Sequence, residues 1–286
     1  MTLKEVYKGK KIDQVVELLH KYGANAKIIS GGTDVVIALR NEKISPEVLI
    51  DISKIDELKE IVDHGDHISI GGGVTFTQIV ESDLFLGNLL GLHKACKMVG
   101  SPQIRNMGTI GGNIANGSAA ADSVPPLIAL DAVVSLKSQE GIREIGLEAY
   151  YHEPIRENEL LIEVKFKKPG ENEVLTFSKL GLRKALAISR LTLSSFVEFE
   201  DKKVKSIRVA SGALAKYPMR EVDVENYLLG KALNPDNIEA AIEKLKDSMD
   251  IRLEGRSTLP YKRIAISTIL REALEEAMEF GEEVRA

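Results

Sequence analysis

The sequence predicts an α+β protein in which alternating strands and helices are followed by a β-rich stretch and then by helices. Three observations support this prediction. Short apolar runs alternate with helical patterns and glycine-rich turns through residues 11–166. Two β-rich runs, 188–200 and 204–214, have only a short polar stretch between them, and helical periodicity dominates 221–278. We therefore expect three regions, at residues 1–54, 55–170 and 171–286.

The first region has the pattern of a small α/β unit. Apolar residues recur at helical spacing over 11–22, and Gly23 follows as a C-cap, which predicts a helix. The elements expected after it are a strand at 26–30, a helix at 34–40 and a strand at 48–51.

The second region begins near Ile55 and carries more strands and helices. The alternating run 68–70 leads into Gly71, Gly72 and Gly73, which we interpret as a sharp turn before a helix capped at Thr75. We then expect a helix at 88–99, a helix with Pro125 and Pro126 in its first turn, and strands at 132–138 and 160–166. The polar, turn-rich stretch 167–172 predicts the boundary to the third region.

The third region combines a hairpin with helices. The polar residues 201–203 between the two β-rich runs indicate a hairpin turn, although no Asn-Gly pair is present there. Helices are expected at 221–229, 235–249 and 259–278. In the last helix a broad apolar stripe predicts packing on its own domain, and the stripe consists of Ile264, Ile266, Ile269, Leu270, Ala273, Leu274 and Ala277.

Composition excludes several classes of function. The 286 residues carry a net charge of -5, so no basic surface for nucleic acid is indicated. No apolar run is long enough to span a membrane, and the N-terminus has no signal-peptide pattern, which predicts a cytoplasmic protein. The single cysteine, Cys96, excludes an internal disulfide or a multi-cysteine metal site, and the five histidines show no metal-ligand spacing. We expect Cys96 to be a packed residue and no metal to be bound.

Two glycine-rich segments are the main candidates for a binding site. SGGTD at 30–34 follows an apolar run and precedes an expected helix, and TIGGNIANGSAAAD occupies 109–122. Paired glycines let backbone N–H groups approach an anion closely, because no Cβ stands in the way. Neither segment matches the GxGxxG or GxxxxGK[ST] phosphate motifs. The alternative is that both glycine pairs only form tight turns.

Polar side chains in these segments suggest a dinucleotide ligand. Asp34 lies at the start of an expected helix, where its simplest role is to accept hydrogen bonds from the first N–H groups. Thr109, Asn113 and Asn116 can hydrogen-bond a ligand, and Asp122 is an acceptor suited to ribose or ribityl hydroxyls.

Three stretches resemble the FAD-binding medium subunits of the molybdenum hydroxylases, the family of xanthine, nicotinate and aerobic carbon monoxide dehydrogenase flavoproteins. These stretches are SGGTDVVIAL at 30–39, GSPQIRNMGTIGGNIANGSAAADSVPPLIALDAVV at 100–134 and FSKLGLRKALAIS at 177–189. The resemblance covers nearly the whole chain. It implies a two-subdomain FAD-binding fold of the vanillyl-alcohol-oxidase-like type, with FAD between the subdomains. A C-terminal domain of a small antiparallel sheet and helices should follow.

The resemblance also implies which residues hold FAD. The pyrophosphate should be wrapped, mainly by backbone groups, by Ile29, Ser30, Gly31, Gly32, Thr33 and Asp34. Its other side should be closed by Thr109, Gly111, Gly112 and Asn113, while Asn116 and Asp122 should bind hydroxyls.

Contacts to the flavin ring are assigned less directly by the resemblance. The segment 183–188 is expected beside the ring, with Arg183 and Ile188 as contacts and a cation available to stabilise negative charge on the reduced ring. The alternative for this segment is a solvated basic turn. At Val99 this chain has an aliphatic residue where xanthine oxidase relatives carry an aromatic residue.

The function implied by the resemblance is electron relay, with no catalytic residue in this chain. In the family a molybdenum-cofactor subunit hydroxylates the substrate, and an iron–sulfur subunit conducts electrons to the flavin. The flavin then reduces NAD(P) or another acceptor. GSPQIRN and LRKALAIS look closest to the xanthine and nicotinate dehydrogenase branches. The alternatives are a carbon monoxide or aldehyde dehydrogenase flavoprotein, a stand-alone FAD-dependent oxidoreductase, and a binding protein without flavin.

Overall fold

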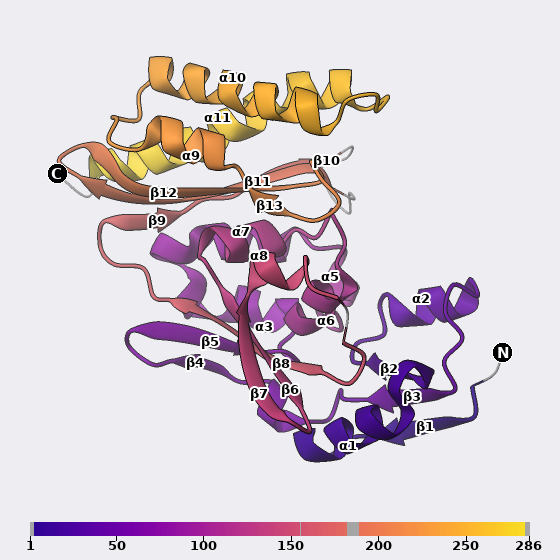
Figure 1. Cartoon of the computed structure of the whole chain (residues 1–286). Helices are drawn as coiled ribbons and strands as arrows, with labels where there is room; N and C mark the ends of the chain where they lie inside the picture. The colour runs from indigo at the N-terminus through magenta and orange to yellow at the C-terminus, as the bar shows by residue number, and fades with distance from the viewer. Residues whose placement is uncertain (1–2, 155, 182–188, 284–286) are drawn as a thin grey trace.

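The described residues fold into three β-sheets that follow one another from the N-terminus to the C-terminus (Figure 1). The computed structural model describes residues 3–154, 156–181 and 189–283. The sheets lie within residues 5–51, 61–167 and 173–220. Helices and strands are mixed throughout, which confirms the predicted α+β class. The domain boundaries expected near residues 54 and 170 remain predictions.

The N-terminal sheet is a small parallel sheet with the order β1-β3-β2. Its strands are β1 (Glu5–Lys8), β2 (Ala26–Ile29) and β3 (Val48–Asp51). Helix α1 (Ile12–Tyr22) buries Val15, Val16 and Leu19, and it ends at Gly23, whose φ of 48° favours glycine. Helix α2 (Val35–Arg40) follows β2. The helices and two of the three strands lie where the sequence predicts them.

The central sheet is antiparallel and has the order β4-β5-β8-β6-β7. The strands are β4 (Ile61–Asp63), β5 (His67–Gly71), β6 (Val133–Ser138), β7 (Gly141–Gly146) and β8 (Leu160–Lys167). The helices of this region are α3 (Phe76–Glu81), α4 (Leu90–Lys97), α5 (Pro102–Arg105), α6 (Ile110–Asn116), α7 (Val124–Ala129) and α8 (Leu147–Tyr150). Short 3-10 turns occupy Gly23–Asn25, Asp56–Leu58, Asp83–Phe85 and Gly87–Leu89.

The triple glycine begins with the last residue of β5 and has a structural role, as expected, and the structure adds that it permits close packing. A Cβ at Gly71 would lie 2.4 Å from the Leu58 carbonyl oxygen, and one at Gly72 would lie 2.5 Å from the Leu161 carbonyl oxygen. Only glycine allows this close approach of neighbouring backbones. Thr75 then caps α3 in a reciprocal capping box with Gln78, which confirms the predicted helix start.

The C-terminal sheet is antiparallel and has the order β10-β11-β12-β13, with β9 paired to β11. Its strands are β9 (Glu173–Leu175), β10 (Ser178–Gly181), β11 (Ser189–Glu200), β12 (Lys203–Gly212) and β13 (Met219–Arg220). The predicted hairpin is confirmed. Asp201 and Lys202 take φ values of 47° and 64°, which are left-handed values typical of a two-residue hairpin turn.

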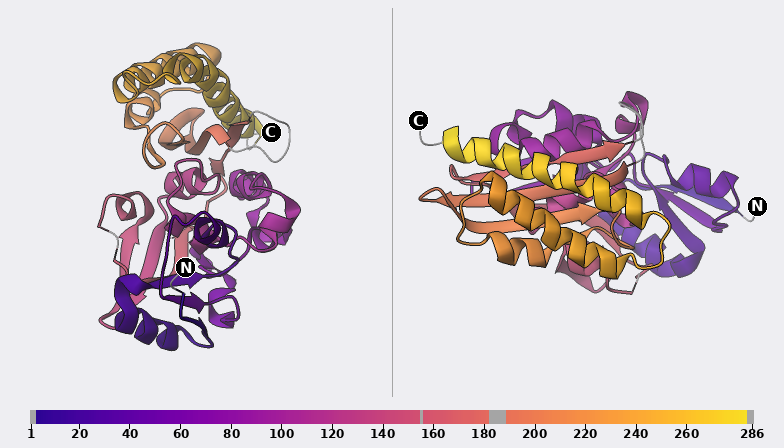
Figure 2. Two further views of the ribbon diagram at one scale, coloured as in Figure 1. Left: turned by 90° about the vertical axis from the view of Figure 1, so that its right-hand side faces the viewer. Right: turned by 90° about the horizontal axis from the view of Figure 1, so that it is seen from above.

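Helices cover both faces of the C-terminal sheet (Figures 1 and 2). Helices α9 (Val222–Leu228), α10 (Pro235–Arg252) and α11 (Leu259–Glu283) lie on the outer side, and α7 packs against β11 and β12 on the inner side. Most of the predicted apolar stripe of α11 is buried. Ile264 is the exception, because 78% of it is exposed, so its assignment to the packed stripe is wrong.

In the part of the chain that the structure describes, three apolar cores hold these layers together, one for each sheet. The central core also includes Leu175, Phe196 and Ala210 from the C-terminal sheet, so this sheet is packed firmly on the central region. Among the described residues, no helix is both long and apolar enough to cross a lipid bilayer.

Cys96 is predicted to be unreactive toward thiol reagents in the folded chain. The side chain is fully buried on α4, and burial raises the pKa of the thiol, with a smaller contribution from the charge of Asp122. We expect a thiol titration at pH 8 to detect no reactive cysteine in native protein and one per chain in denaturant. Rapid reaction of native protein would contradict the packing described for α4.

Candidate functional site

The first glycine-rich segment joins β2 to α2, as the sequence predicts. Gly32 takes a φ of 71°, in the left-handed region that favours glycine. Gly31 is required for a different reason, because a Cβ there would lie 1.7 Å from the carbonyl oxygen of Met107. The first segment is therefore packed directly against the backbone that leads into the second segment at Thr109.

Backbone donors remain available in the first segment. Within the described residues, no protein acceptor pairs with the backbone N–H groups of Gly31, Gly32 and Thr33. Consecutive unpaired N–H groups on a glycine turn form a concave donor surface that suits a phosphate group. This arrangement fits the pyrophosphate expected at this segment.

The second segment differs from the expected loop, because its first half is helical. Thr109 is the N-cap of α6, and its hydroxyl oxygen accepts a hydrogen bond of 3.1 Å from the N–H of Gly112. The N–H of Ile110 donates to Val74, and that of Gly111 donates to Gly72 at 3.0 Å. The first N–H groups of α6 thus have protein acceptors. These glycines can serve a ligand by allowing close approach rather than by N–H donation.

The two glycines of α6 face different surroundings. A Cβ at Gly111 would lie 2.5 Å from the carbonyl oxygen of Gly72, so this glycine is needed for packing against the triple-glycine turn. Gly112 is exposed, and a Cβ there would meet only the Thr109 hydroxyl, at 2.9 Å. Gly112 is therefore the position in α6 where the absence of a side chain leaves room for a ligand.

Asp34 links the two segments instead of capping α2. Its side chain makes no capping hydrogen bond, which corrects the expected role. The backbone of Asp34 is already helical, with φ -108° and ψ -47°, whereas a capping residue needs an extended backbone. One carboxylate oxygen accepts from the amide of Asn116 at 3.2 Å, and the other accepts from Thr33 at 3.3 Å. Asp34 and Asn116 thus hold the first segment against the end of α6.

Asp122 lies in a buried polar cluster at the junction with the C-terminal sheet. The residue is 7% exposed, and its carboxylate accepts from the ammonium of Lys179 at 2.6 Å and from the hydroxyl of Ser189. Lys179 also donates to the carbonyl of Met98 at 3.0 Å. Burial raises the pKa of Asp122, while Lys179 and Ser189 oppose this rise. Sequence reasoning did not single out Lys179, although it lies within the resembling stretch 177–189.

Two neighbouring groups complete the polar surroundings. Asn113 accepts a hydrogen bond of 2.8 Å from Ser123 through its carbonyl oxygen, so its NH2 group is the part left for a ligand. Thr192 pairs in register with Lys179, is fully buried, and its hydroxyl has no hydrogen-bond partner among the described residues. A buried hydroxyl of this kind is uncommon and leaves hydrogen-bonding capacity beside the ion pair.

The expected flavin-ring contacts Arg183 and Ile188 lie outside the described residues. The described neighbours on either side are Gly181 on β10 and Ser189 on β11. Because Ser189 contacts Asp122, the chain returns from this segment directly beside the buried cluster.

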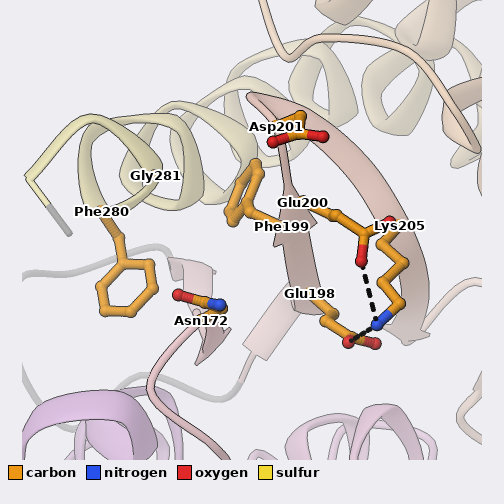
Figure 3. A pocket seen from close by; sticks show the side chains of 8 residues that line it. All are labelled: Asn172, Glu198, Phe199, Glu200, Asp201, Lys205, Phe280 and Gly281. Atoms are coloured by element: carbon orange, nitrogen blue, oxygen red, sulfur yellow. Dashed lines mark ion pairs between the residues drawn. The ribbon is translucent and has the colours of Figure 1, made fainter. Parts of the chain in front are cut away.

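A separate hollow of about 220 Å³ lies between the β11–β12 hairpin and the end of α11 (Figure 3). Glu198 and Glu200 both pair with Lys205 beside it, and none of the predicted site residues contributes to its lining. Among the described residues, no group of three or more His, Cys, Asp or Glu side chains could hold a metal ion. The candidate site therefore consists of the two glycine-rich segments and the Asp122 cluster.

Two family models match most of the chain. Residues 2–167 match the family model described as the FAD binding domain in molybdopterin dehydrogenase, and residues 176–277 match that of the CO dehydrogenase flavoprotein C-terminal domain. The nicotinate dehydrogenase FAD-subunit of Eubacterium barkeri is 33% identical over 93% of each chain. The xanthine dehydrogenase FAD-binding subunit of Escherichia coli O157:H7 is 29% identical over 88% of this chain and 89% of its own.

A solved structure confirms the fold implied by the resemblance. A chain of carbon monoxide dehydrogenase from Hydrogenophaga pseudoflava superposes with a TM-score of 0.90 at 27% identity, covering 97% of this chain and 98% of its own. The family match covers more than half of the sequence, and the relatives match over nearly their full lengths. This chain belongs to the family of FAD-binding subunits of the molybdenum hydroxylases, and it is an oxidoreductase subunit whose cofactor is FAD.

Proposed function

We propose that this subunit takes electrons from an iron–sulfur subunit and passes them to NAD or NADP, within an enzyme that also contains a molybdenum-cofactor subunit. The holoenzyme would be of the nicotinate or xanthine dehydrogenase type and cytoplasmic. The observation that carries this proposal is the set of open N–H groups at Gly31, Gly32 and Thr33, packed beside α6 in a chain 33% identical to a nicotinate dehydrogenase FAD-subunit.

We assign the FAD contacts to the residues expected from the sequence. Backbone groups of 29–34 bind the pyrophosphate from one side, and the exposed surface at Gly112 with Thr109, Gly111 and Asn113 closes the other side. Asn116 and Asp122 bind hydroxyls, and Arg183 and Ile188 contact the ring. Lys179 is added as the residue that holds the Asp122 carboxylate in place, at 2.6 Å.

Bound FAD supplies the redox chemistry, accepting electrons and passing them to the acceptor. The chain itself binds and orients this group. The unpaired N–H groups offset the negative charge of the pyrophosphate, and the buried Lys179–Asp122 pair, with both side chains 7% exposed, keeps water from that side of the site. This task needs no general base, so the substrate is expected to bind to another subunit.

The choice of branch rests on sequence similarity. The nicotinate and xanthine dehydrogenase relatives are 33% and 29% identical, whereas the carbon monoxide dehydrogenase medium chain of Hydrogenophaga pseudoflava is 27% identical. A second candidate is a carbon monoxide or aldehyde dehydrogenase flavoprotein. It is favoured by the TM-score of 0.90 to a carbon monoxide dehydrogenase chain. The two candidates differ in the partner subunit and in the electron acceptor.

The proposal predicts that NADH or NADPH reduces the FAD of the isolated chain. Under anaerobic conditions the visible flavin absorbance should bleach on addition of the reduced dinucleotide, since electron transfer with the acceptor is reversible. Nicotinate and xanthine should leave the spectrum unchanged, because their binding site lies on another subunit. A flavin that resists both NADH and NADPH but is reduced by dithionite would exclude NAD(P) as the acceptor.

Gly112→Val is predicted to remove FAD while leaving the fold largely intact. The new side chain enters the open space beside α6, and its Cβ meets only the Thr109 hydroxyl, at 2.9 Å. We expect the dissociation constant for FAD to rise by at least about tenfold, equivalent to about 1.4 kcal/mol. Gly146→Val is the matched control, because nothing lies within 4 Å of its Cβ position. Stoichiometric FAD in Gly112→Val would show that the pyrophosphate lies elsewhere.

A further inference from the structure

Three consecutive backbone carbonyls at the end of α4, those of residues 98–100, each accept a hydrogen bond from a cationic side chain. The ammonium of Lys179 on β10 donates to Met98 at 3.0 Å. One guanidinium nitrogen of Arg105 on α5 donates to the next two carbonyls, at 3.2 and 3.3 Å. Carbonyls at a helix C-terminus carry partial negative charge, so cations suit them. Residues 98–100, which we call the carbonyl segment, are therefore held from two separate elements.

The carbonyl segment bends sharply onto α5. Gly100 takes a φ of 45°, and a Cβ there would lie 2.8 Å from Cγ2 of Ile104. Ser101 then caps α5, since its hydroxyl accepts from the N–H of Ile104 at 3.3 Å. Arg105 is the last residue of this helix, so its guanidinium reaches back to the bend that precedes the helix. The conformation of the carbonyl segment thus depends on α5 and on Lys179.

These contacts belong to a closed circuit around the candidate site. Helix α5 leads to Met107, whose carbonyl lies against the backbone of Gly31 in the first glycine-rich segment. In the other direction, Lys179 joins the carbonyl segment to Asp122, at the end of the second glycine-rich segment. The two glycine-rich segments are themselves joined by the hydrogen bond of 3.2 Å described above. The carbonyl segment therefore belongs to the same set of contacts as both glycine-rich segments.

The strand that carries Lys179 also leads to the residues assigned to the flavin ring. Strand β10 ends at Gly181, two residues after Lys179, and the assigned segment 183–188 follows. The chain returns at Ser189, whose hydroxyl donates to Asp122. Lys179 thus contacts the carbonyl segment from a position just before the ring contacts.

We propose that Arg105 is a positioning residue of the flavin site, which fixes the carbonyl segment as the side of the site against which the flavin ring rests. This inference rests on the proposed function, because it uses the FAD contacts assigned there. Arg105 acts through the backbone and needs no contact with FAD. Both hydrogen bonds that its guanidinium makes within the described residues go to the carbonyl segment. Charge-assisted hydrogen bonds of this kind are stronger than neutral ones, so they hold the segment firmly.

The test measures two properties of the full chain: the dissociation constant for FAD, by titration, and the visible circular dichroism of bound flavin, which reports the surroundings of the ring. Arg105→Met should raise the dissociation constant about tenfold, as expected for loss of a charge-assisted hydrogen bond. At saturating FAD it should also change the dichroism. Arg105→Lys keeps a cationic donor and should recover most of the affinity and the wild-type dichroism. A residue that only ended α4 would change the unfolding of the apo chain without altering either flavin property.

Gly100→Ala disturbs the carbonyl segment while Arg105 stays in place. The new Cβ meets Ile104, and a φ of 45° is unfavourable for alanine, so the same two changes in the flavin properties are expected. This variant decides the question if Arg105→Met does not fold. Arg263→Met is the charge control, because its guanidinium pairs with Asp250 at 2.9 Å on the outer helices. It should match the wild type in both measurements.

The outcomes separate this inference from the proposed function. If the wild-type chain binds FAD and folded Arg105→Met binds it with the same affinity and dichroism, the inference is wrong and the proposed function stands. The inference also fails if Arg105→Lys is as impaired as Arg105→Met, or if Arg263→Met shows the same changes, since loss of charge in general would then explain them. If the wild-type chain takes up no FAD, the assigned cofactor site is wrong and the inference falls with it.

Discussion

Replacing Gly31 with alanine is expected to abolish FAD binding and to destabilise the chain by about 3 kcal/mol or more. The new Cβ would lie 1.7 Å from the carbonyl oxygen of Met107 and 2.3 Å from its carbonyl carbon. Backbone cannot yield as a flexible side chain can, so the first segment must move away from α6. The unpaired N–H groups of Gly31 and Gly32 would then move with it, away from the position assigned to the pyrophosphate.

Two measurements check this prediction. Denaturant unfolding of the apo chain gives the loss of stability, and titration with FAD gives the loss of binding. Gly146→Ala is the matched control, because its φ is -56° and nothing lies within 4 Å of its Cβ position, so it should behave like the wild type. Wild-type stability and FAD affinity in Gly31→Ala would mean that the two segments are not packed as described.

Lys179→Met is expected to have the second largest effect, destabilising the chain by about 3–5 kcal/mol. The substitution leaves the carboxylate of Asp122, which is 7% exposed, without its cationic partner. An unpaired buried charge is costly, because it has lost its water without gaining a counter-ion. Lys205→Met is the control. Its side chain is 49% exposed and its ion pair with Glu198 lies at the surface, so it should cost less than about 1 kcal/mol.

A double variant separates the structural role of the pair from its ligand role. Replacing both members, in Lys179→Met with Asp122→Leu, should restore most of the stability, because no unpaired charge remains. FAD affinity should not be restored, since Asp122 is assigned to a hydroxyl of the cofactor. Recovery of both stability and FAD affinity would show that the pair only supports packing.

Elements with local signals could be predicted from the sequence. Helix α1 has a regular apolar face and a glycine C-cap, and the start of α3 has the Thr75 and Gln78 capping box. The β11–β12 hairpin has long apolar strands around a short polar turn. Strands β4 and β13 are only three and two residues long, so they are too short to show an alternating pattern.

The helix α6 was missed because its glycines suggested a loop. Two glycines in seven residues weaken the intrinsic preference for helix. Neighbouring backbone compensates, because Val74 and Gly72 accept the N–H groups of Ile110 and Gly111. These acceptors lie in the turn after β5, far from α6 in the sequence, so the support is a tertiary contact. No local pattern could have indicated it.

The sequence proposes the residues of the candidate site but not the contacts between them. The glycine segments and Asp122 were identified from residue type, spacing and resemblance. The Asp122–Lys179 pair joins residues 57 positions apart, and the Asp34–Asn116 contact joins residues 82 positions apart. The first pair depends on how the C-terminal sheet packs on the central region, and the second depends on how residues 30–34 pack beside α6. A single sequence contains no signal for either packing.

The visible absorption spectrum of the purified full chain, followed by identification of the released chromophore, tests the central claim most directly. We predict a flavin spectrum and one FAD per chain, either as purified or after addition of FAD and removal of the excess. A colourless chain that takes up no added FAD would contradict the assignment of the two glycine-rich segments as a cofactor site.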